Sequence, residues 1–295
     1  MYNGIINVYK EAGYTSFDVV ARLRGILKQK KIGHTGTLDP DATGVLPVVV
    51  GNATKLVDML TDKKKEYVAT FMLGITTDTL DASGQVLGRA QVDASEDDVV
   101  KAVMSFNGDI MQIPPMFSAL KVDGKKLCDL AREGKTVERK PRPVTIHEIE
   151  ILDIDIPNVK LKVLCSKGTY IRTLCDDIGR MIGCGAVMTS LLRTVSGRFT
   201  ADDAHTLDEI EQSMKQGRIE ELIIPTDAVF EDACEYVAKG QEYSLVSNGN
   251  KITIPDMTCD KVKIYDTDHR FMALYELSDK KRRIYKPGLM FLSNQ

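Results

Sequence analysis

The stretch GHTGTLDPDATG, residues 33–44, gathers side chains that could do chemistry directly before an apolar run at 45–50. It contains one histidine, three threonines and two aspartates among three glycines and one proline. Glycines allow a ligand to approach the backbone closely, and Pro40 biases Asp39 toward an extended conformation. The stretch is therefore either a polar turn or a loop that presents a carboxylate to a substrate.

Several kinds of site do not fit these residues. A phosphate-binding loop requires a lysine followed by serine or threonine after the glycines, and a serine nucleophile requires a GxSxG-type elbow. A metal site from His34, Asp39 and Asp41 is conceivable, but the other histidines are scattered and no HxH or HxxxH spacing occurs, so we expect no metal. Two interpretations remain: Asp39 acts as a lone carboxylate, or it bonds its own backbone in a turn. Composition alone favours the turn.

The charge of the chain is unevenly distributed. The net charge is −3, but residues 201–235 hold eleven acids and two bases. Residues 22–31 hold five bases and no acids, and residues 121–142 hold eight bases and four acids. Local basic surfaces are typical of proteins that bind phosphates, although a solvated face balanced by the acidic segment would look the same.

Length and composition limit the class of protein. The 295 residues, 43% hydrophobic and 27% charged, suffice for one large or two ordinary domains. No apolar run approaches the length that spans a bilayer, and no basic-then-apolar leader is visible. None of the six cysteines forms a CxxC pair. We therefore expect a cytoplasmic protein with reduced thiols.

Hydrophobic periodicity predicts the elements that must position the loop. Helices are expected over 16–30, with Ser16 as its cap, and over 95–106, 170–183 and 206–216. Strands are expected over 66–74, 144–155 and 159–165. After residue 225, short strand candidates at 251–254, 260–266, 270–277 and 282–286 alternate with turns. We expect an α+β catalytic domain at 1–227, interrupted by a basic insertion at 112–143, and a small β-rich domain at 228–295.

Five segments in the same order and spacing resemble the TruB family, the tRNA pseudouridine-55 synthases. They are KEAGYTSFDVV (10–20), GHTGTLDPDATGVLP (33–47), KEYVATFMLGITTDTLDASG (65–84), QIPPMFSALKVDGKKLCDLAREG (112–134) and CSKGTYIRTLCDDIG (165–179). The resemblance implies a pseudouridine synthase fold, with a mixed, largely antiparallel sheet, flanking helices and an RNA-clasping insertion. It also implies a C-terminal domain similar to the PUA RNA-binding domain.

The resemblance implies that a uridine is isomerised without cofactor, by breaking its N1–C1′ bond and joining C5 to C1′. Asp39 falls on the essential aspartate of the family. It would attack the sugar, attack the base or remove a sugar proton, and each route requires its ionised form. Arg172 matches the arginine that would keep Asp39 ionised. Asp81 matches an acid that would orient Arg172.

The resemblance also implies a site for a uridine flipped out of the RNA stack. Tyr67 matches the tyrosine that stacks on the base, Tyr170 and Leu191 match pocket residues, and His34 matches a histidine beside the nucleotide. The partner would be the T-arm stem-loop of tRNA, bound by a monomer without an obligate protein partner. Basic residues expected at the RNA backbone are Arg22, Arg24, Lys28, Lys30, Lys31, Lys121, Lys125, Lys126 and Arg142.

Two other interpretations stay open. One is a relative guided by a separate RNA and partner proteins. The other is a catalytically idle RNA-binding or RNA-folding protein, against which the intact Asp39, Tyr67 and Arg172 speak. The chain also departs from the family pattern at Phe17, Glu11 and Thr194, which concerns contacts to RNA rather than the reaction.

Overall fold

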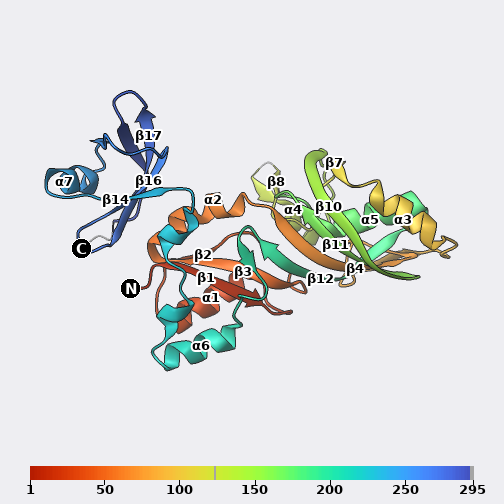
Figure 1. Ribbon diagram of the computed structural model, residues 1–295. Helices are drawn as coiled ribbons and strands as arrows, with labels where there is room; N and C mark the ends of the chain where they lie inside the picture. The colour runs from red at the N-terminus through yellow and green to blue at the C-terminus, as the bar shows by residue number, and fades with distance from the viewer. Residues whose placement is uncertain (123, 293–295) are drawn as a thin grey trace.

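A nine-stranded sheet organises the larger, N-terminal part of the computed structural model, which describes residues 1–122 and 124–292 (Figure 1). Its strand order is β1-β3-β12-β4-β11-β10-β7, with β2 paired to β3 and β13 paired to β12. Only the β3–β12 pair is parallel among the strand pairs described in this sheet. The mixed, largely antiparallel sheet confirms the predicted α+β class. Its strands are β1 (Gly4–Lys10), β2 (Ile32–His34), β3 (Thr43–Val50), β4 (Lys65–Leu73), β7 (Gly108–Gln112), β10 (Arg142–Asp155), β11 (Asn158–Cys165), β12 (Ala186–Ser196) and β13 (Phe199–Thr200).

Helices cover the sheet in two groups. Helices α1 (Ser16–Leu27) and α6 (Leu207–Lys215) pack together and share a core with β1 and β3 (Figure 1). Helices α3 (Glu96–Met104) and α5 (Ile171–Ile182) pack on β4, β10 and β11. The short α2 (Val57–Thr61) follows a 3₁₀ turn after β3. All four predicted helices are present.

The cap of α1 was predicted wrongly. Thr15 is the N-cap, and its hydroxyl accepts a hydrogen bond from the Asp18 amide. The hydroxyl of Ser16 instead bonds to the backbone of Leu38, so it joins α1 to the loop that holds Asp39. Both side chains suit an N-cap, and the distant partner of Ser16 decides between them.

Periodicity located β4, β10 and β11 but did not predict the other strands of this sheet, among them β1 and β12. β1 is fully apolar along most of its length and β12 mixes polar and apolar residues, so neither alternates as a half-buried strand does. β12 lies between β3 and β4 and thereby connects the two halves of the sheet. Of the predicted site residues, Tyr67 lies on β4 and Leu191 on β12, and the loop that contains Asp39 leads into β3.

The insertion at 112–143 contains regular structure. Its elements are β8 (Lys121–Val122), β9 (Lys125–Lys126) and α4 (Leu127–Arg132), with β8 and β9 forming a small hairpin. A second small hairpin, β5 (Ile75–Thr77) and β6 (Val86–Arg89), follows β4 and encloses the segment that contains Asp81.

A five-stranded sheet forms the C-terminal unit, set to one side of the larger part that holds the nine-stranded sheet (Figure 1). Its elements are β14 (Cys234–Val237), α7 (Gln241–Ser247), β15 (Ile252–Thr253), β16 (Lys261–Tyr265), β17 (Phe271–Asp279) and β18 (Ile284–Met290). Phe230, Leu274 and Phe291 share a buried cluster with Ile5 and Val45, which joins this unit to the large sheet. The four predicted strands are present, with bounds shifted by a few residues.

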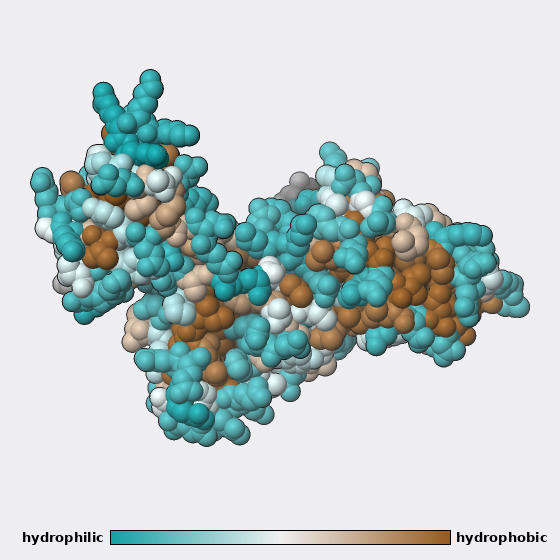
Figure 2. Space-filling model, in the orientation of Figure 1, coloured by the Kyte–Doolittle hydropathy of each residue, from teal (hydrophilic) through white to brown (hydrophobic). Residues whose placement is uncertain are grey.

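Two further sequence expectations meet the structure here. Cys234 and Cys259 are disulfide-bonded with their Cα atoms 6.0 Å apart, so the expectation of six reduced thiols is wrong for this pair. Among the described residues, no helix is both long and apolar enough to traverse a bilayer. Hydrophobic colour in Figure 2 gathers where Figure 1 places β10, α3 and α5, whereas the C-terminal unit is mostly hydrophilic on this face.

Candidate active site

The loop between β2 and β3 carries Asp39, and a buried lysine donates hydrogen bonds to its backbone. The side chain of Lys10, at the end of β1, is fully buried. Its ammonium donates hydrogen bonds to the carbonyl oxygens of Pro40 (2.8 Å), Ala42 (2.6 Å) and Glu11 (2.9 Å). Burial lowers the pKa of Lys10 to about 8, and the nearby carboxylates oppose that shift. Lys10 thus fixes the backbone immediately after Asp39.

A buried arginine holds the other parts of the same loop. Arg193, on β12, has no exposed surface. Its guanidinium donates to the carbonyl oxygens of Val45 (2.7 Å), Gly36 (3.3 Å) and Thr37 (3.4 Å). These carbonyls lie on both sides of Asp39 in the sequence, so one planar cation with several donors sets the path of the loop.

Arg172 links Asp39 to a second carboxylate, Asp81. Oδ1 of Asp39 lies 2.8 Å from a terminal nitrogen of Arg172, at the start of α5. The other terminal nitrogen of Arg172 lies 3.3 Å from Oδ2 of Asp81. The side chain of Arg172 is 7% exposed and that of Asp39 is 34% exposed. The structure therefore brings together the three predicted catalytic residues and leaves Asp39 open to a ligand.

The protonation of Asp39 follows from two opposing influences. Burial raises the pKa of Asp39 above its ordinary value, and the negative charge of Asp81 adds to that rise. The cations of Arg172 and Lys10 oppose the rise. A nearly buried guanidinium favours the ionised form of the neighbouring carboxylate, while burial makes that carboxylate more basic than a solvated aspartate.

Asp81 is itself held rigidly. It accepts hydrogen bonds from the hydroxyls of Thr79 (2.7 Å) and Ser83 (2.6 Å) and from the Ser83 amide (3.1 Å). Backbone hydrogen bonds join this segment to Met188 on β12. Asp81 can therefore orient Arg172 without moving.

An apolar wall faces this polar cluster. Tyr67 on β4 and Leu191 on β12 are buried in one cluster with Leu38, the neighbour of Asp39. Tyr67 lies directly across from Arg193 in the strand register. Burial raises the pKa of Tyr67, so its hydroxyl is neutral at physiological pH. The wall is suited to contact the flat face of a base.

The insertion reaches the site through its first residues. The side-chain amide of Gln112 accepts a bond from the Tyr170 amide (2.8 Å) and donates one to the Tyr170 carbonyl (3.1 Å). Arg172 donates to the carbonyl of Phe117 at 2.9 Å. Tyr170 itself occupies the N-cap position of α5, and burial raises the pKa of its hydroxyl. The insertion and Arg172 are thus in direct contact.

His34 is half-buried at the end of β2, and its Nδ1 has no hydrogen-bond partner among the described residues. Burial and the charge of Arg193 lower the pKa of His34, so the imidazole is neutral at pH 7. Its place at the start of the loop fits a role beside the nucleotide. Among the residues described, no group of three His, Cys, Asp or Glu side chains is placed to hold a metal ion.

The predicted RNA-backbone residues divide into two sets. Arg22 forms ion pairs with Asp208 (2.8 Å) and Glu211 (3.1 Å) on α6, so its charge is already neutralised within the protein. Arg24 is half-buried and donates to the carbonyl of Ile32 at 3.3 Å. The remaining residues are exposed and form no ion pair within residues 1–122 and 124–292; they are Lys28, Lys30, Lys31, Lys121, Lys125, Lys126 and Arg142.

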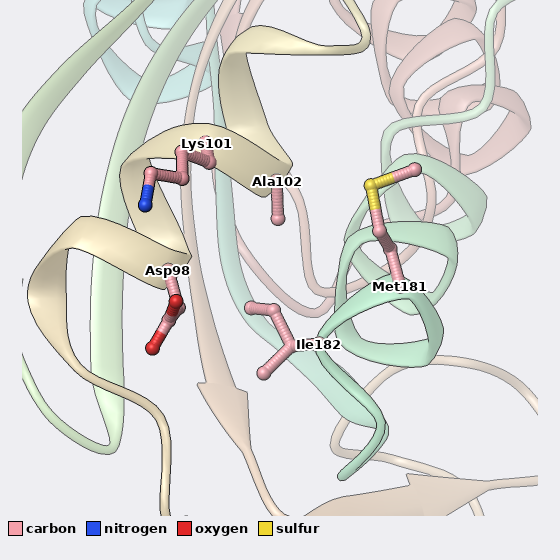
Figure 3. Close-up of a pocket in the computed structure, with 5 residues that line it drawn as sticks. All are labelled: Asp98, Lys101, Ala102, Met181 and Ile182. Carbon is pink, nitrogen blue, oxygen red and sulfur yellow. The ribbon is translucent and has the colours of Figure 1, made fainter.

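A hollow between α3 and α5 lies apart from this site (Figure 3). It is lined by Asp98, Lys101, Ala102, Met181 and Ile182. The Asp98 carboxylate already caps α3 through Ser95. Met181 follows Arg172 on the same helix by nine residues, which is about 13 Å along the axis. The hollow is separate from the cluster around Asp39.

Lys10, Arg193 and Gln112 shape the site although none was predicted as a site residue, and Ser16 was predicted only as a helix cap. Each acts through backbone atoms rather than through a motif of its own. The available signals were a lysine ending the apolar segment GIINVYK and an arginine in the apolar stretch SLLRTV. A long cation in an otherwise buried strand requires internal partners.

Comparison with known proteins identifies the relatives of this chain. The family model described as TruB family pseudouridylate synthase (N terminal domain) matches residues 24–171. The model described as tRNA pseudouridylate synthase B C-terminal domain matches residues 172–231. The tRNA pseudouridine synthase B of Lachnoclostridium phytofermentans is 50% identical over 307 residues, which cover 98% of this chain and all of that protein.

Two further comparisons agree. The tRNA pseudouridine synthase B of Clostridium acetobutylicum is 45% identical over 291 residues, covering 96% of this chain and 99% of that protein. A solved chain from the structure titled "Crystal Structure of a Cbf5-Nop10-Gar1 Complex" superposes with a TM-score of 0.72 at 29% identity. That match covers 98% of this chain and 85% of the solved chain.

Proposed function

This chain belongs to the TruB family and is a tRNA pseudouridine synthase, and we propose that it isomerises the uridine at position 55 in the T-loop of tRNA with Asp39 as the essential carboxylate. The reaction breaks the bond between N1 and C1′ and forms a bond between C5 and C1′. C5 loses its proton and N1 gains one, so the product is an isomer. The hydrogen-bonded series Asp39–Arg172–Asp81 supports this proposal most directly.

Asp39 starts the reaction as an ion. Its side chain is about one-third exposed, while Arg172 is nearly buried behind it. The guanidinium therefore stabilises the carboxylate from the protein side and leaves the other side free for the nucleoside. Asp81 holds Arg172 in this orientation through its second terminal nitrogen. Because this arrangement exists before substrate binds, little reorganisation is needed when charge develops.

The flipped uracil would contact the wall formed by Tyr67 and Leu191, with Tyr170 at the start of α5 closing the pocket. Taking a base out of an RNA stack costs about a few kcal/mol, and stacking on an aromatic ring returns about 1–3 kcal/mol. Tyr67 suits this role because its ring is held by burial in the core of the sheet. His34 would support the rearranged loop of the RNA from the start of the catalytic loop.

The exposed cations would hold the stem of the T-arm. Lys28, Lys30 and Lys31 follow α1, and Lys121, Lys125 and Lys126 lie on the hairpin of the insertion. Phosphate contacts position an RNA without reading its sequence, which fits recognition of a stem-loop by shape. We propose that residues 1–227 form the catalytic domain and residues 228–295 an accessory RNA-binding domain. The chain would act in the cytoplasm as a monomer, without a cofactor.

Mapping of pseudouridine in a bare RNA tests the proposal. The purified protein is incubated with an unmodified T-arm stem-loop, without guide RNA or partner protein, and the modified positions are mapped by carbodiimide adducts and primer extension. We expect a single pseudouridine at position 55 and none in a matched RNA with cytidine there. Modification elsewhere only, or dependence on an added guide RNA or protein, would refute it.

A further inference from the structure

Phe17 is an exposed aromatic residue beside the catalytic loop. It lies in the first turn of α1 and is 63% exposed. Its neighbour Ser16 is buried and bonds to the backbone of Leu38 through both its donor and acceptor functions. Leu38 precedes Asp39. The backbone that carries Phe17 is therefore hydrogen-bonded, through Ser16, to the residue that precedes Asp39.

A single exposed hydrophobic side chain is common and needs no explanation by itself. Phe17 differs because it belongs to a stripe along α1. Positions i, i+4 and i+7 lie on one side of a helix, and in α1 they are occupied by Phe17, Ala21 and Arg24. Lys28 follows the helix directly as its C-cap residue, in a left-handed backbone conformation. The small side chain of Ala21 leaves space over the middle of the stripe. The stripe thus runs from an aromatic ring at the site to cations farther away.

The charges along the stripe are free to meet an anion. The one acid in α1, Asp18, is occupied with the Thr15 cap. Arg22, on the other side of the helix, is neutralised by α6. Arg24 and Lys28 form no ion pair among the described residues, and Lys30 and Lys31 extend the basic surface beyond the helix. Arg22 on one side of α1 is therefore neutralised within the protein, whereas Arg24 and Lys28 keep their charge available for an anion.

The guanidinium of Arg24 lies over the ring of Phe17, 5.8 Å from the ring centroid. It is tethered by a hydrogen bond to the carbonyl of Ile32, and its Nε is buried without a partner in the described structure. A cation near the ring and a half-buried anchor restrict how the guanidinium can move. An aromatic ring next to a cation is the combination that single-stranded nucleic acid selects for stacking and phosphate contact.

We propose that Phe17 is a stacking platform for a second, unpaired base of the substrate RNA, with Arg24 and Lys28 contacting the phosphates that follow it. The proposal rests on the proposed function, because it takes RNA as the ligand. The base is distinct from the uridine that meets Tyr67 and Asp39. Phe17 is thus a positioning residue: it strengthens RNA binding and sets the register of the RNA, and it does not touch the reacting atoms.

Tryptophan fluorescence gives a direct readout, since the chain contains no tryptophan. The Phe17→Trp variant places one reporter on the stripe. Met104→Trp is the matched control, because Met104 is 47% exposed at the end of α3, which Figure 1 shows well away from α1. Each variant is titrated with the T-arm stem-loop while fluorescence anisotropy of a labelled RNA reports binding. We expect quenching and loss of iodide accessibility for the indole at position 17 and neither change at position 104.

Kinetics test the same proposal independently. Phe17→Ala should weaken RNA binding and raise KM by about tenfold, with the saturated rate unchanged, while Phe17→Trp should retain wild-type values. Met104→Ala should match wild type in all respects, and thermal melting should show all variants folded. Unchanged binding by Phe17→Ala, or an unquenched indole at position 17 in RNA-bound protein, would overturn the proposal. Wild-type protein that fails to modify the stem-loop would instead count against the proposed function.

Discussion

Replacing Arg172 by lysine should slow the isomerisation by about 10- to 100-fold. The guanidinium reaches Asp39 (2.8 Å) and the Phe117 carbonyl (2.9 Å) with one nitrogen, and Asp81 (3.3 Å) with the other. A lysine ammonium is compact and lacks this planar fork, so it cannot serve both sides at once. Loss of one hydrogen bond to a charged partner is worth about 1.5–3 kcal/mol, and each 1.36 kcal/mol changes a rate by about tenfold.

The same replacement should shift the pH dependence. Arg172 opposes the rise that burial imposes on the pKa of Asp39. A misplaced cation therefore raises that pKa further, and more of the enzyme is protonated and inactive at a given acidic pH. The acidic limb of the rate profile should move upward from its wild-type position, which already lies above the ordinary aspartate value of 3.8.

Single-turnover release of tritium from C5-labelled uridine, measured across pH, provides the assay. Arg180→Lys is a suitable control, because Arg180 lies on the same helix but is 70% exposed and pairs with Asp176 instead. The control should keep both the rate and the acidic limb of wild type. If Arg172→Lys also keeps both, Arg172 does not support the ionised carboxylate.

Further changes test the scaffold beneath the loop. Lys10→Met leaves two loop carbonyls without their donor and should lower the free energy of unfolding by about 1–3 kcal/mol in urea titrations, whereas Lys30→Met at an exposed position should not. Burial lowers the pKa of Lys10 from 10.5 to about 8, so the unfolded chain binds this proton more tightly than the folded one. Between those two pH values the free energy of unfolding should therefore rise with pH in the wild-type protein. That rise should be missing in Lys10→Met. Arg193→Met should destabilise the fold by about 3 kcal/mol or more in thermal melting and should reduce turnover even where the protein remains folded, because the carbonyls on both sides of Asp39 lose their shared donor.

Local patterns predicted the elements, and long-range contacts decided the site. Alternation in β11 and the helical stripe of α5 were visible because neighbouring residues encode them. The pairing of Asp39 with Arg172 joins residues 133 positions apart, which no local period can reveal. Only the order of five motifs suggested it, and on composition alone Asp39 was better explained as a turn residue.

The errors have similar causes. Thr15 and Ser16 are both good caps, and the bond from Ser16 to Leu38 settled their roles. β12 was missed because its burial comes from neighbours on both sides rather than from alternation. Arg22 was expected to meet RNA from its charge alone, but the facing acids on α6 are distant in the sequence. Asp41 remains an exposed residue of the turn after Pro40.

The central claim is that Asp39 performs the isomerisation from a preorganised loop, and replacement by asparagine tests it most directly. Asparagine keeps the shape of the side chain but cannot carry the negative charge that Arg172 stabilises. Under single-turnover conditions, Asp39→Asn should release no tritium from a C5-labelled T-arm while binding that RNA within about tenfold of wild type. Wild-type tritium release by the folded variant would contradict the assignment of Asp39.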